Sequence, residues 1–406
     1  MHAVPFPSEQ AMTAWMAARH AAELGANASF SALRRQRVLM TADTTSPVWQ
    51  YALELGRALT GAGHDVALAT TGGMPDREQR RDADAIAGLE LHASAYKPFP
   101  FEDCAERRAA GRWLFDLAAA IRPSVLHLNG FDHADLPWRV PVLLAVHTCA
   151  QSWWRAVHGT PVPQSWRWYR QQVAAALRMA DAVVAPTLAT LHGLHRHHGS
   201  LPAARVIANG RDPANTPKPE KGEYVFSRAD PGDRSQNFAA LEAAAGRLPW
   251  SLCVASSGER HSGAADAGAG IRMLGRLSGS HAGRWLARAP VYTLPALHAP
   301  AGLSLHDAAL ARCALVLGDV EGLREVWDGA AIFVDPHDDE ALVHALQRLI
   351  ADRSARECHA ELAFVRAARY SASAMAAAYA AAYAEISPSA CADPEPVWAA
   401  PAQMRC

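Results

Sequence analysis

The sequence predicts an α/β protein with two Rossmann-like, doubly wound domains that face each other across a cleft. The chain has 406 residues, too many for one typical core and enough for two domains of about 150 to 200 residues. Short apolar runs alternate with helical patterns, as they do in parallel sheets covered on both faces. The alternation pauses at residues 211–222, which are rich in Pro, Gly and polar side chains as a linker would be, and then resumes.

The composition is that of a globular protein without a basic surface for nucleic acid. Half of the residues are hydrophobic and the formal net charge is −1. Seven cysteines, an odd number without CxxC spacing, argue against a disulfide framework and a zinc site and favour a reducing compartment. The sequence shows no secretory leader and no run of about 18 apolar residues, so we expect a cytoplasmic protein without a transmembrane segment.

The first domain is predicted at residues 37–210, after an Ala-rich helical extension at 1–36. Residues 37–43, 48–62 and 65–71 predict a first βαβ unit, and Pro47 suits the first turn of its helix. Further strands are predicted at 89–94, 125–129, 141–147, 182–185 and 205–210, with helices at 104–122 and 166–179. The first strand is not followed by GxGxxG, which argues against a dinucleotide-dependent oxidoreductase.

The second domain is predicted at residues 223–370. Its strands are expected at 224–226, 252–255, 271–274, 291–294, 314–317 and 331–334, and a long helical pair at 339–386. Of that pair, residues 371–386 are expected to form a C-terminal helix that packs back on the first domain. The Pro-rich residues 387–406 are expected to be a disordered tail.

A strand, loop and helix pattern at residues 295–310 is the most suggestive stretch of the second domain. Gly302 offers a permissive backbone where the loop turns into the helix that begins near Leu303, and a helix N-terminus attracts anions. Any βα unit of an open sheet shares this pattern. Lys occurs only at positions 97, 218 and 221, so phosphate contacts would fall to Arg or to backbone N–H groups.

The order of the segments resembles family 4 of the glycosyltransferases over roughly residues 37–386. In the first half the matching segments are 38–43 with 48–55, 127–130, 147–154, 180–187 and 206–212. In the second half they are Arg228 with Gln236 and Asn237, 274–278, 295–310, 323–326 and 334–336. The resemblance implies the two-domain GT-B fold and transfer of a sugar from a nucleotide-sugar donor with retention of anomeric configuration.

The resemblance also implies roles for particular residues. His147 would lie near the donor sugar, and Arg228, with Arg234 and the helix start at Gly302 and Leu303, would face the diphosphate. Asp307 stands where the second Glu of the family signature Glu-x7-Glu contacts the ribose. We assign His147 and Asp307 to catalysis, and to donor binding a set that includes departures from the family: Ser46, Arg228, Arg234, Gln236, Asn237, Ala299, Gly302, Leu303 and Asp307.

The departures weaken the expected donor site. Ser46 and Pro47 replace two Gly of the first loop, Gln236 replaces a Lys, and Ala299 replaces the first signature Glu. A charge-assisted hydrogen bond contributes about 1.5–3 kcal/mol, so Gln236 could weaken donor binding about 10- to 100-fold unless Arg234 compensates. Loss of the carboxylate at Ala299 is expected to matter most, with Gln236 next, whereas Asp307 keeps its charge.

Each candidate residue also has a structural explanation. Arg228 could be a surface cation, and His147 could be a structural histidine at a strand end. Asp307 could be an acidic residue near a helix N-terminus that interacts favourably with the helix dipole. A polar helix face explains the histidines at 192, 195, 197 and 198 better than a metal site does. Core packing likewise explains the tryptophans at 153, 154, 166 and 168 better than stacking on an acceptor does.

The expected function is that of a hexosyltransferase that needs no metal and no cofactor. Its partners would be a nucleotide-sugar donor and a glycan, a lipid-linked or a small-molecule acceptor, with no nucleic acid. The alternative is a degenerate GT-B protein that is inactive and acts as a binding or regulatory partner. A sugar-phosphate epimerase or a phosphorylase on the same fold is less favoured, since a pyridoxal-dependent phosphorylase needs a Lys in the second domain and none follows Lys221.

Overall fold

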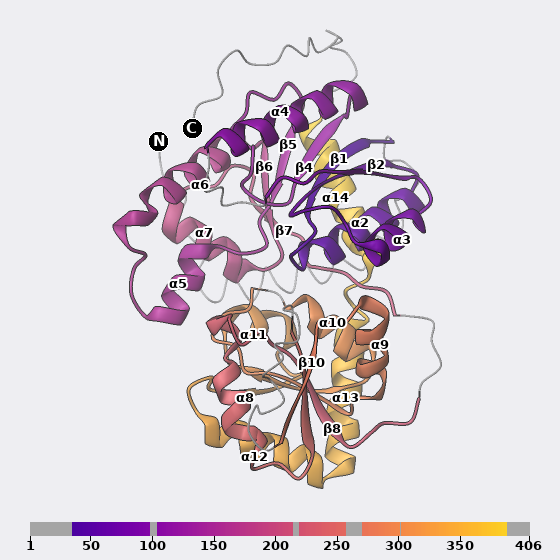
Figure 1. The fold of residues 1–406 in the computed structure, drawn as a ribbon, viewed down its shortest axis with the longest axis vertical. Helices are drawn as coiled ribbons and strands as arrows, with labels where there is room; N and C mark the ends of the chain where they lie inside the picture. The colour runs from indigo at the N-terminus through magenta and orange to yellow at the C-terminus, as the bar shows by residue number, and fades with distance from the viewer. Residues whose placement is uncertain (1–34, 98–103, 214–218, 257–269, 301, 388–406) are drawn as a thin grey trace.

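In the computed structural model of the chain, two parallel α/β sheets lie one above the other (Figure 1). The structure describes residues 35–97, 104–213, 219–256, 270–300 and 302–387. The predicted N-terminal extension, up to residue 34, and the tail from 388 onward lie outside the described residues. No described helix combines the length and the apolar character needed to cross a membrane.

The first sheet has seven parallel strands in the order β3-β2-β1-β4-β5-β6-β7. The strands are β1 (Arg37–Asp43), β2 (Asp65–Thr71), β3 (Leu89–Ala93), β4 (Val125–Leu128), β5 (Val142–Ala145), β6 (Ala182–Ala185) and β7 (Arg205–Val206). The reversal of strand order beside β1 is the topological switch point at which open sheets bind ligands.

Helices cover both faces of the first sheet because the strands alternate their buried side chains. Val38 and Met40 pack with α2 (Val48–Gly61), whereas Leu39 between them packs with α4 (Cys104–Ile121) and α6 (Arg167–Met179). Shorter helices complete the domain, namely α3 (Arg77–Asp84), α5 (Ala150–His158), η3 (Gln164–Trp166) and α7 (Leu188–His198). Neither α3 nor α5 was predicted from the sequence.

The second sheet has six parallel strands in the order β10-β9-β8-β11-β12-β13. They are β8 (Tyr224–Arg228), β9 (Ser251–Ala255), β10 (Ile271–Gly275), β11 (Val291–Leu294), β12 (Ala314–Gly318) and β13 (Ile332–Val334). Its helices are η4 (Arg234–Gln236), α8 (Phe238–Ala245), α9 (Gly279–Arg288), α10 (Leu303–Leu310), α11 (Glu321–Trp327), α12 (Asp339–Ala351) and α13 (Arg353–Ala367).

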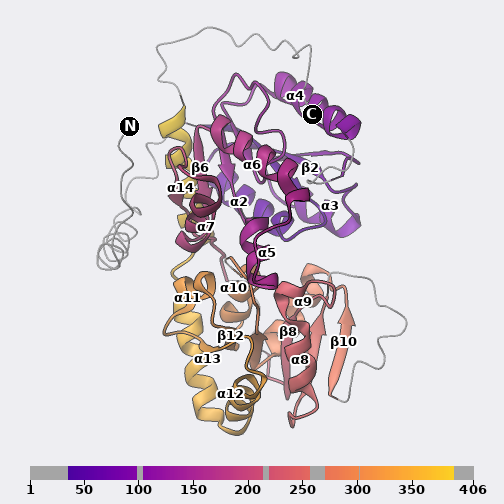
Figure 2. The same cartoon turned by 90° about the vertical axis from the view of Figure 1, so that its left-hand side faces the viewer.

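The last described helix, α14 (Ala372–Ile386), returns to the first domain (Figure 2). Its side chains Met375, Tyr379 and Tyr383 are buried in the same cluster as Val38 and Met40 of β1. The predicted helical pair at 339–386 is therefore wrong in number, because three helices occupy this range. Asp352 and Ser371 start α13 and α14 by accepting hydrogen bonds from Ala355 N and Ala374 N at 2.9 and 3.1 Å.

The strand predicted at 205–210 is shorter than expected. Only Arg205 and Val206 pair with β6, because the chain then turns toward the start of α14. Gly210 packs directly on that turn, where a Cβ atom would clash with the Ser371 carbonyl oxygen. The next residue, Arg211, donates its N–H to the Tyr370 carbonyl at 2.8 Å, so this part of the connection between the sheets is firmly attached.

Candidate functional site

The two domains meet at the carboxyl ends of their strands, where α5, α7, α10 and α11 lie close together (Figure 1). Thr187 donates its hydroxyl to the Pro300 carbonyl of the second domain at 3.0 Å. Glu325 of α11 accepts the N–H groups of Leu188 and Ala189 at 2.8 and 3.0 Å, which caps the N-terminus of α7 from the opposite domain. We call this region the junction.

On the side of the second domain, Arg228 lies at the carboxyl end of β8, next to the start of α10. Its guanidinium lowers the pKa of the Tyr292 hydroxyl, although burial raises that pKa overall, and the same hydroxyl is 3.0 Å from Ser304 in the first turn of α10. Among the residues that the structure describes, Arg228 has no carboxylate within ion-pair distance. A cation and a helix N-terminus thus share one side of the junction.

The start of α10 depends on Gly302, as the sequence predicted. This residue has φ +56°, and a Cβ atom would lie only 2.5 Å from Leu305 Cδ1, so a larger residue would strain the turn. Among the residues that the structure describes, no side chain caps the helix, which begins at Leu303. Its first N–H groups therefore lack a side-chain partner, and the macrodipole favours an anion at this end.

Gln236 and Asn237 are committed to the protein itself. Gln236 accepts the N–H of Asp230 at 2.7 Å and donates to Asp233 Oδ2 at 2.8 Å, so its side chain closes its own loop. Asn237 adopts φ +56° and donates from Nδ2 to the carbonyls of Pro295 and Pro336 at 3.0 and 2.6 Å. Both residues shape the loop, and Asn237 ties it to the stretch before α10.

Arg234, in contrast, is exposed and reaches across the junction. Its Nη1 is 3.5 Å from Nδ1 of His158, at the end of α5 in the first domain. Arg234 is the cation of the loop at residues 229–237, and no carboxylate in the described part of the chain lies within ion-pair distance of it. The role of Arg234 in place of the missing Lys stays a prediction.

Ala299 offers only a methyl group to the junction, and His298 beside it faces the first domain. The Nε2 atom of His298 is 3.4 Å from the Thr148 hydroxyl, and its backbone N–H points to the Ser235 carbonyl at 3.3 Å. Burial lowers the pKa of His298 to about 4, so the imidazole is neutral at pH 7. A neutral histidine does not replace the charge of the missing Glu.

Asp307, which is expected to contact the ribose, is held in an ion pair. Its Oδ1 lies 2.6 Å from Nε of Arg211, and the same guanidinium is 3.5 Å from Glu54 Oε2 on α2. The predicted carboxylate is therefore neutralised by a cation of the segment between the two sheets. Arg211 was not predicted as a site residue, although its place near the end of the matched segment 206–212 could have indicated a role.

On the side of the first domain, Ser46 serves the loop between β1 and α2. Its hydroxyl accepts the N–H of Val48 at 3.2 Å, while Asp43 Oδ1 accepts the N–H of Thr45 at 2.8 Å. Pro47, which has no N–H, begins the helical turn. This loop offers fewer free backbone donors than the two Gly of the family would.

His147, which follows β5, is held by a chain of polar side chains from β4, the loop after it and α14. Its Nε2 is 2.9 Å from Oδ1 of Asn129, which is also 3.1 Å from Nε2 of His127. Nδ1 of His127 is in turn 2.6 Å from the Tyr383 hydroxyl. Burial lowers the pKa of His147 to about 4 and that of His127 to about 3, so both are neutral at pH 7. Sequence reasoning named only His147.

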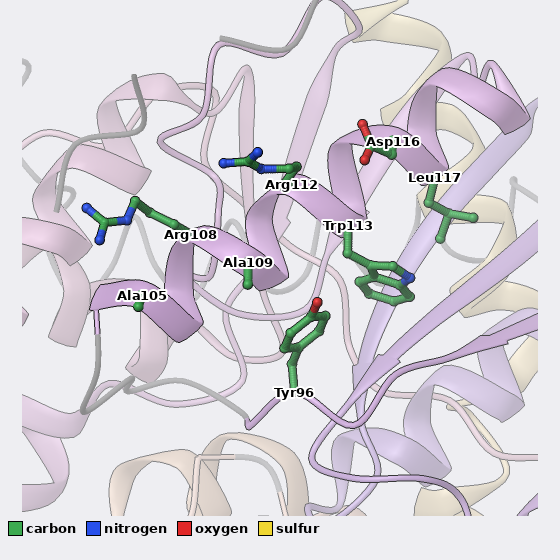
Figure 3. Close-up of a pocket in the computed structure, with 8 residues that line it drawn as sticks. All are labelled: Tyr96, Ala105, Arg108, Ala109, Arg112, Trp113, Asp116 and Leu117. Carbon is green, nitrogen blue, oxygen red and sulfur yellow. The ribbon is translucent and has the colours of Figure 1, made fainter. Parts of the chain in front are cut away.

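A depression of about 510 Å³ lies apart from these residues, along α4 (Figure 3). The side chains of Arg112, Trp113 and Asp116 project from the helix, with the Tyr96 ring beside Trp113. None of the predicted site residues lines this depression. The candidate site is therefore the junction.

Two facing Rossmann-like domains, with a cation and an open helix start on one side and a strand-end histidine on the other, define the GT-B class of glycosyltransferases. Comparison with family models agrees. Residues 48–215 match Glycosyltransferase Family 4, and residues 235–352 match Glycosyl transferases group 1. The chain belongs to these GT-B glycosyltransferases, and the predicted resemblance and fold class are confirmed.

Solved structures share the fold over nearly the whole chain. A sucrose-phosphate synthase from Thermosynechococcus elongatus has a TM-score of 0.69 and 18% identity, covering 86% of this chain and 99% of its own. Anabaena HepE in complex with UDP and glucose has a TM-score of 0.67 and 13% identity, covering 86% of this chain and 100% of its own. A search of curated proteins finds no match to the sequence.

Proposed function

We propose that the protein is a cytoplasmic, retaining hexosyltransferase that takes its sugar from a nucleotide-sugar donor and needs no metal. The single observation that carries the proposal is Arg228, a cation without a carboxylate partner in the described residues, next to the uncapped start of α10. A departing diphosphate is the ligand that such a pair would stabilise. The acceptor would be a glycan, a lipid-linked sugar or a small molecule.

In this mechanism the acceptor oxygen attacks the anomeric carbon from the face that the diphosphate leaves. The new glycosidic bond forms as the bond to the diphosphate oxygen breaks, and the acceptor proton passes to the departing phosphate. Arg228, Arg234 and the first N–H groups of α10 would stabilise the negative charge that develops on the diphosphate. His147 would position the sugar and Asp307 the nucleotide.

The comparisons support a nucleotide and a hexose without identifying either for this chain. HepE was solved in complex with UDP-glucose as well as with UDP and glucose. A trehalose 6-phosphate synthase from Burkholderia multivorans also shares the fold, with a TM-score of 0.61 and 13% identity over 87% of this chain and 99% of its own. We therefore place UDP-glucose first among the donors to be tried.

A second candidate function is that of an inactive GT-B protein that binds or regulates a partner. The observation that favours it concerns three donor-site positions, of which two are committed to other contacts and one has no polar group. Gln236 is bound within its loop, Asp307 is paired with Arg211, and Ala299 has only a methyl group. Under this hypothesis the junction has kept its shape but lost the groups that hold the transferred sugar.

A thermal-shift screen of the purified chain against UDP, GDP, ADP and their sugar conjugates tests the two functions. A ligand at about 100 times its Kd adds about 2.7 kcal/mol of stability, which raises Tm by several degrees. A shift with one sugar nucleotide, followed by its turnover with a panel of acceptors, supports the transferase. No shift with any of them from a folded protein rejects it and favours the binding partner.

Restoring the family residues separates a weak enzyme from a decayed one. The double variant Gln236→Lys, Ala299→Glu supplies the missing cation and carboxylate, and hydrolysis of the sugar nucleotide is the measurement. Arg284→Ala, on the exposed face of α9, is the matched control for an unrelated change of charge. A steep rise from no activity identifies a decayed enzyme, whereas an unchanged zero shows that these two positions alone do not silence the site.

A further inference from the structure

Asn129 joins three strands at the carboxyl edge of the first sheet. Its backbone N–H donates to the Thr41 hydroxyl at 3.0 Å, and its side-chain Nδ2 donates to the Thr41 carbonyl at 2.8 Å. Its Oδ1 faces His127 of β4 and His147, two residues after β5. One amide side chain thus has both of its ends engaged.

These contacts determine which way the amide points. A carbonyl oxygen can only accept a hydrogen bond, so the atom that faces the Thr41 carbonyl must be Nδ2, and Oδ1 must face the two imidazoles. Oδ1 is itself an acceptor. His127 and His147 must therefore both carry a proton on Nε2.

The Tyr383 hydroxyl, at the far end of this chain of hydrogen bonds, supports the same assignment. A neutral His127 with its proton on Nε2 has a lone pair on Nδ1, and the Tyr383 hydroxyl at 2.6 Å donates to it. Tyr383 is fully buried on α14, and the Tyr379 ring lies 4.9 Å from the His127 ring. The other tautomer of His127 would set two donors against each other at Tyr383 unless its hydroxyl turned away.

His147 differs from His127 in having one nitrogen without a partner. With the proton on Nε2, its Nδ1 is a hydrogen-bond acceptor, and among the described residues no donor contacts that atom. The edge of the ring packs against Tyr51 of α2, with ring centroids 4.5 Å apart. The imidazole can therefore neither turn over nor exchange its tautomer without breaking the bond to Asn129.

We infer that Asn129, fixed by Thr41, is a positioning residue that holds His147 as the Nε2–H tautomer, so that Nδ1 accepts a hydrogen bond from a hydroxyl of the bound sugar. His127 and Tyr383 extend this support to the C-terminal helix. The assignment of the sugar hydroxyl as the donor rests on the proposed function. The tautomer itself does not, because it follows from contacts within the chain.

The groups that face His147 explain why the imidazole stays neutral. Tyr51 comes from α2 and His127 from β4, while Tyr379 and Tyr383 of α14 pack behind His127. Burial is the only cause of the lowered pKa of His147, and for His127 the neighbouring His147 adds to the effect of burial. A proton on Nδ1 of His147 would remove the acceptor, so sugar binding should fail as the pH falls toward 4.

The tautomer is measurable without any substrate. Two-bond ¹H–¹⁵N spectra of the protein labelled at histidine, at pH 7, distinguish Nε2–H from Nδ1–H, and His147→Gln and His127→Gln identify the two signals. We expect both to be Nε2–H in the wild type. Tyr379→Phe is the matched control and should leave them unchanged. Tyr383→Phe should also leave them Nε2–H, because Oδ1 of Asn129 still accepts from both rings, whereas Asn129→Leu removes that acceptor and should give a mixture of tautomers at His147. His147 as Nδ1–H in the wild type overturns the inference, and so does an Asn129→Leu spectrum identical to that of Tyr379→Phe.

Activity measurements address the sugar contact. Asn129→Leu removes the acceptor for His147 and should raise KM for the sugar nucleotide about 10-fold, with Kd for the free nucleoside diphosphate unchanged. Asn129→Asp keeps the acceptor but adds a charge that favours imidazolium, so the acidic limb of the pH profile should move up by about one unit or more. The role of Asn129 is overturned if Asn129→Leu weakens the binding of sugar nucleotide and of free diphosphate equally. It is also overturned if the acidic limb of the pH profile does not move in Asn129→Asp. If the wild type shows the expected histidine spectra but turns over no sugar nucleotide, the proposed function is rejected, whereas the positioning of His147 by Asn129 still holds.

Discussion

Asp307 and Arg211 form an ion pair, with 2.6 Å between Oδ1 and Nε, that joins the helix after β11 to the segment between the two sheets. Glu54 of α2 lies 3.5 Å from the same guanidinium, so the pair also connects the two domains. Both partners are about three-quarters buried, with exposed fractions of 28% for Arg211 and 26% for Asp307. A nucleotide that needs the Asp307 carboxylate must therefore share it with Arg211.

The first prediction concerns this competition. Asp307→Asn removes the charge and should weaken binding of the nucleoside diphosphate about 10- to 100-fold, because a hydrogen bond to a charged group contributes about 1.5–3 kcal/mol. Arg211→Leu leaves the carboxylate without its cation and should not weaken binding. Isothermal titration of both variants with the diphosphate is the measurement, and Glu54→Gln is the control. Equal weakening by Asp307→Asn and Arg211→Leu would show that the pair acts only as a structural link between the domains.

The fold was predictable because the buried strands have a pattern that depends on few neighbours. Strands such as β5 and β12 are apolar along their length since helices cover both faces of the sheet. Gly302 was predictable for a local reason, the positive φ at a helix start. The helices α3 and α5 were not predicted, because with 8 and 9 residues they are shorter than the window of about 11 to 18 residues over which a helical pattern is recognised.

The site was harder to predict because its partners lie far apart in the sequence. Tyr383 reaches His127 across 256 residues, and Glu325 reaches Leu188 across 137. No spacing rule relates such positions. Gln236 illustrates the same limit, because the sequence shows a missing Lys but not that the amide would bind Asp230 and Asp233 in its own loop.

The second prediction concerns Arg228. Its removal in Arg228→Ala should weaken binding of a nucleoside diphosphate about 10- to 100-fold, because an unpaired guanidinium beside a helix start is the main positive charge offered to the phosphates. Arg228→Lys should recover part of the loss. The same titration with Arg284→Ala, an exposed cation of α9, should give the wild-type value. Wild-type affinity in Arg228→Ala would instead make Arg228 an ordinary surface cation.

The third prediction concerns the contact between α11 and α7. Glu325 accepts two N–H groups at the start of α7, and the loss of both in Glu325→Ala should cost about 1–2 kcal/mol of stability. For domains of this size, that corresponds to a fall in Tm of several degrees. Glu321→Gln, an exposed carboxylate of the same helix, is the control and should leave Tm within about a degree. A similar Tm for all three proteins would mean that water caps α7 as well as Glu325 does.

The last prediction concerns acid stability. Burial lowers the pKa of His147 and His306 to about 4 and that of His127 to about 3, from 6.5 in the unfolded chain. Because the folded pKa is the lower one, the unfolded chain binds more protons in this range. Stability is therefore complete above about pH 6.5 and is lost as the pH falls toward 4, at about 1.4 kcal/mol per pH unit for each histidine. Urea unfolding between pH 5 and 6 should show this dependence of the free energy of unfolding on pH. The slope should fall by about the contribution of one histidine in His306→Leu and stay unchanged in the control His337→Asn. An unreduced slope in His306→Leu would show that His306 takes up its proton equally in the folded and unfolded chains.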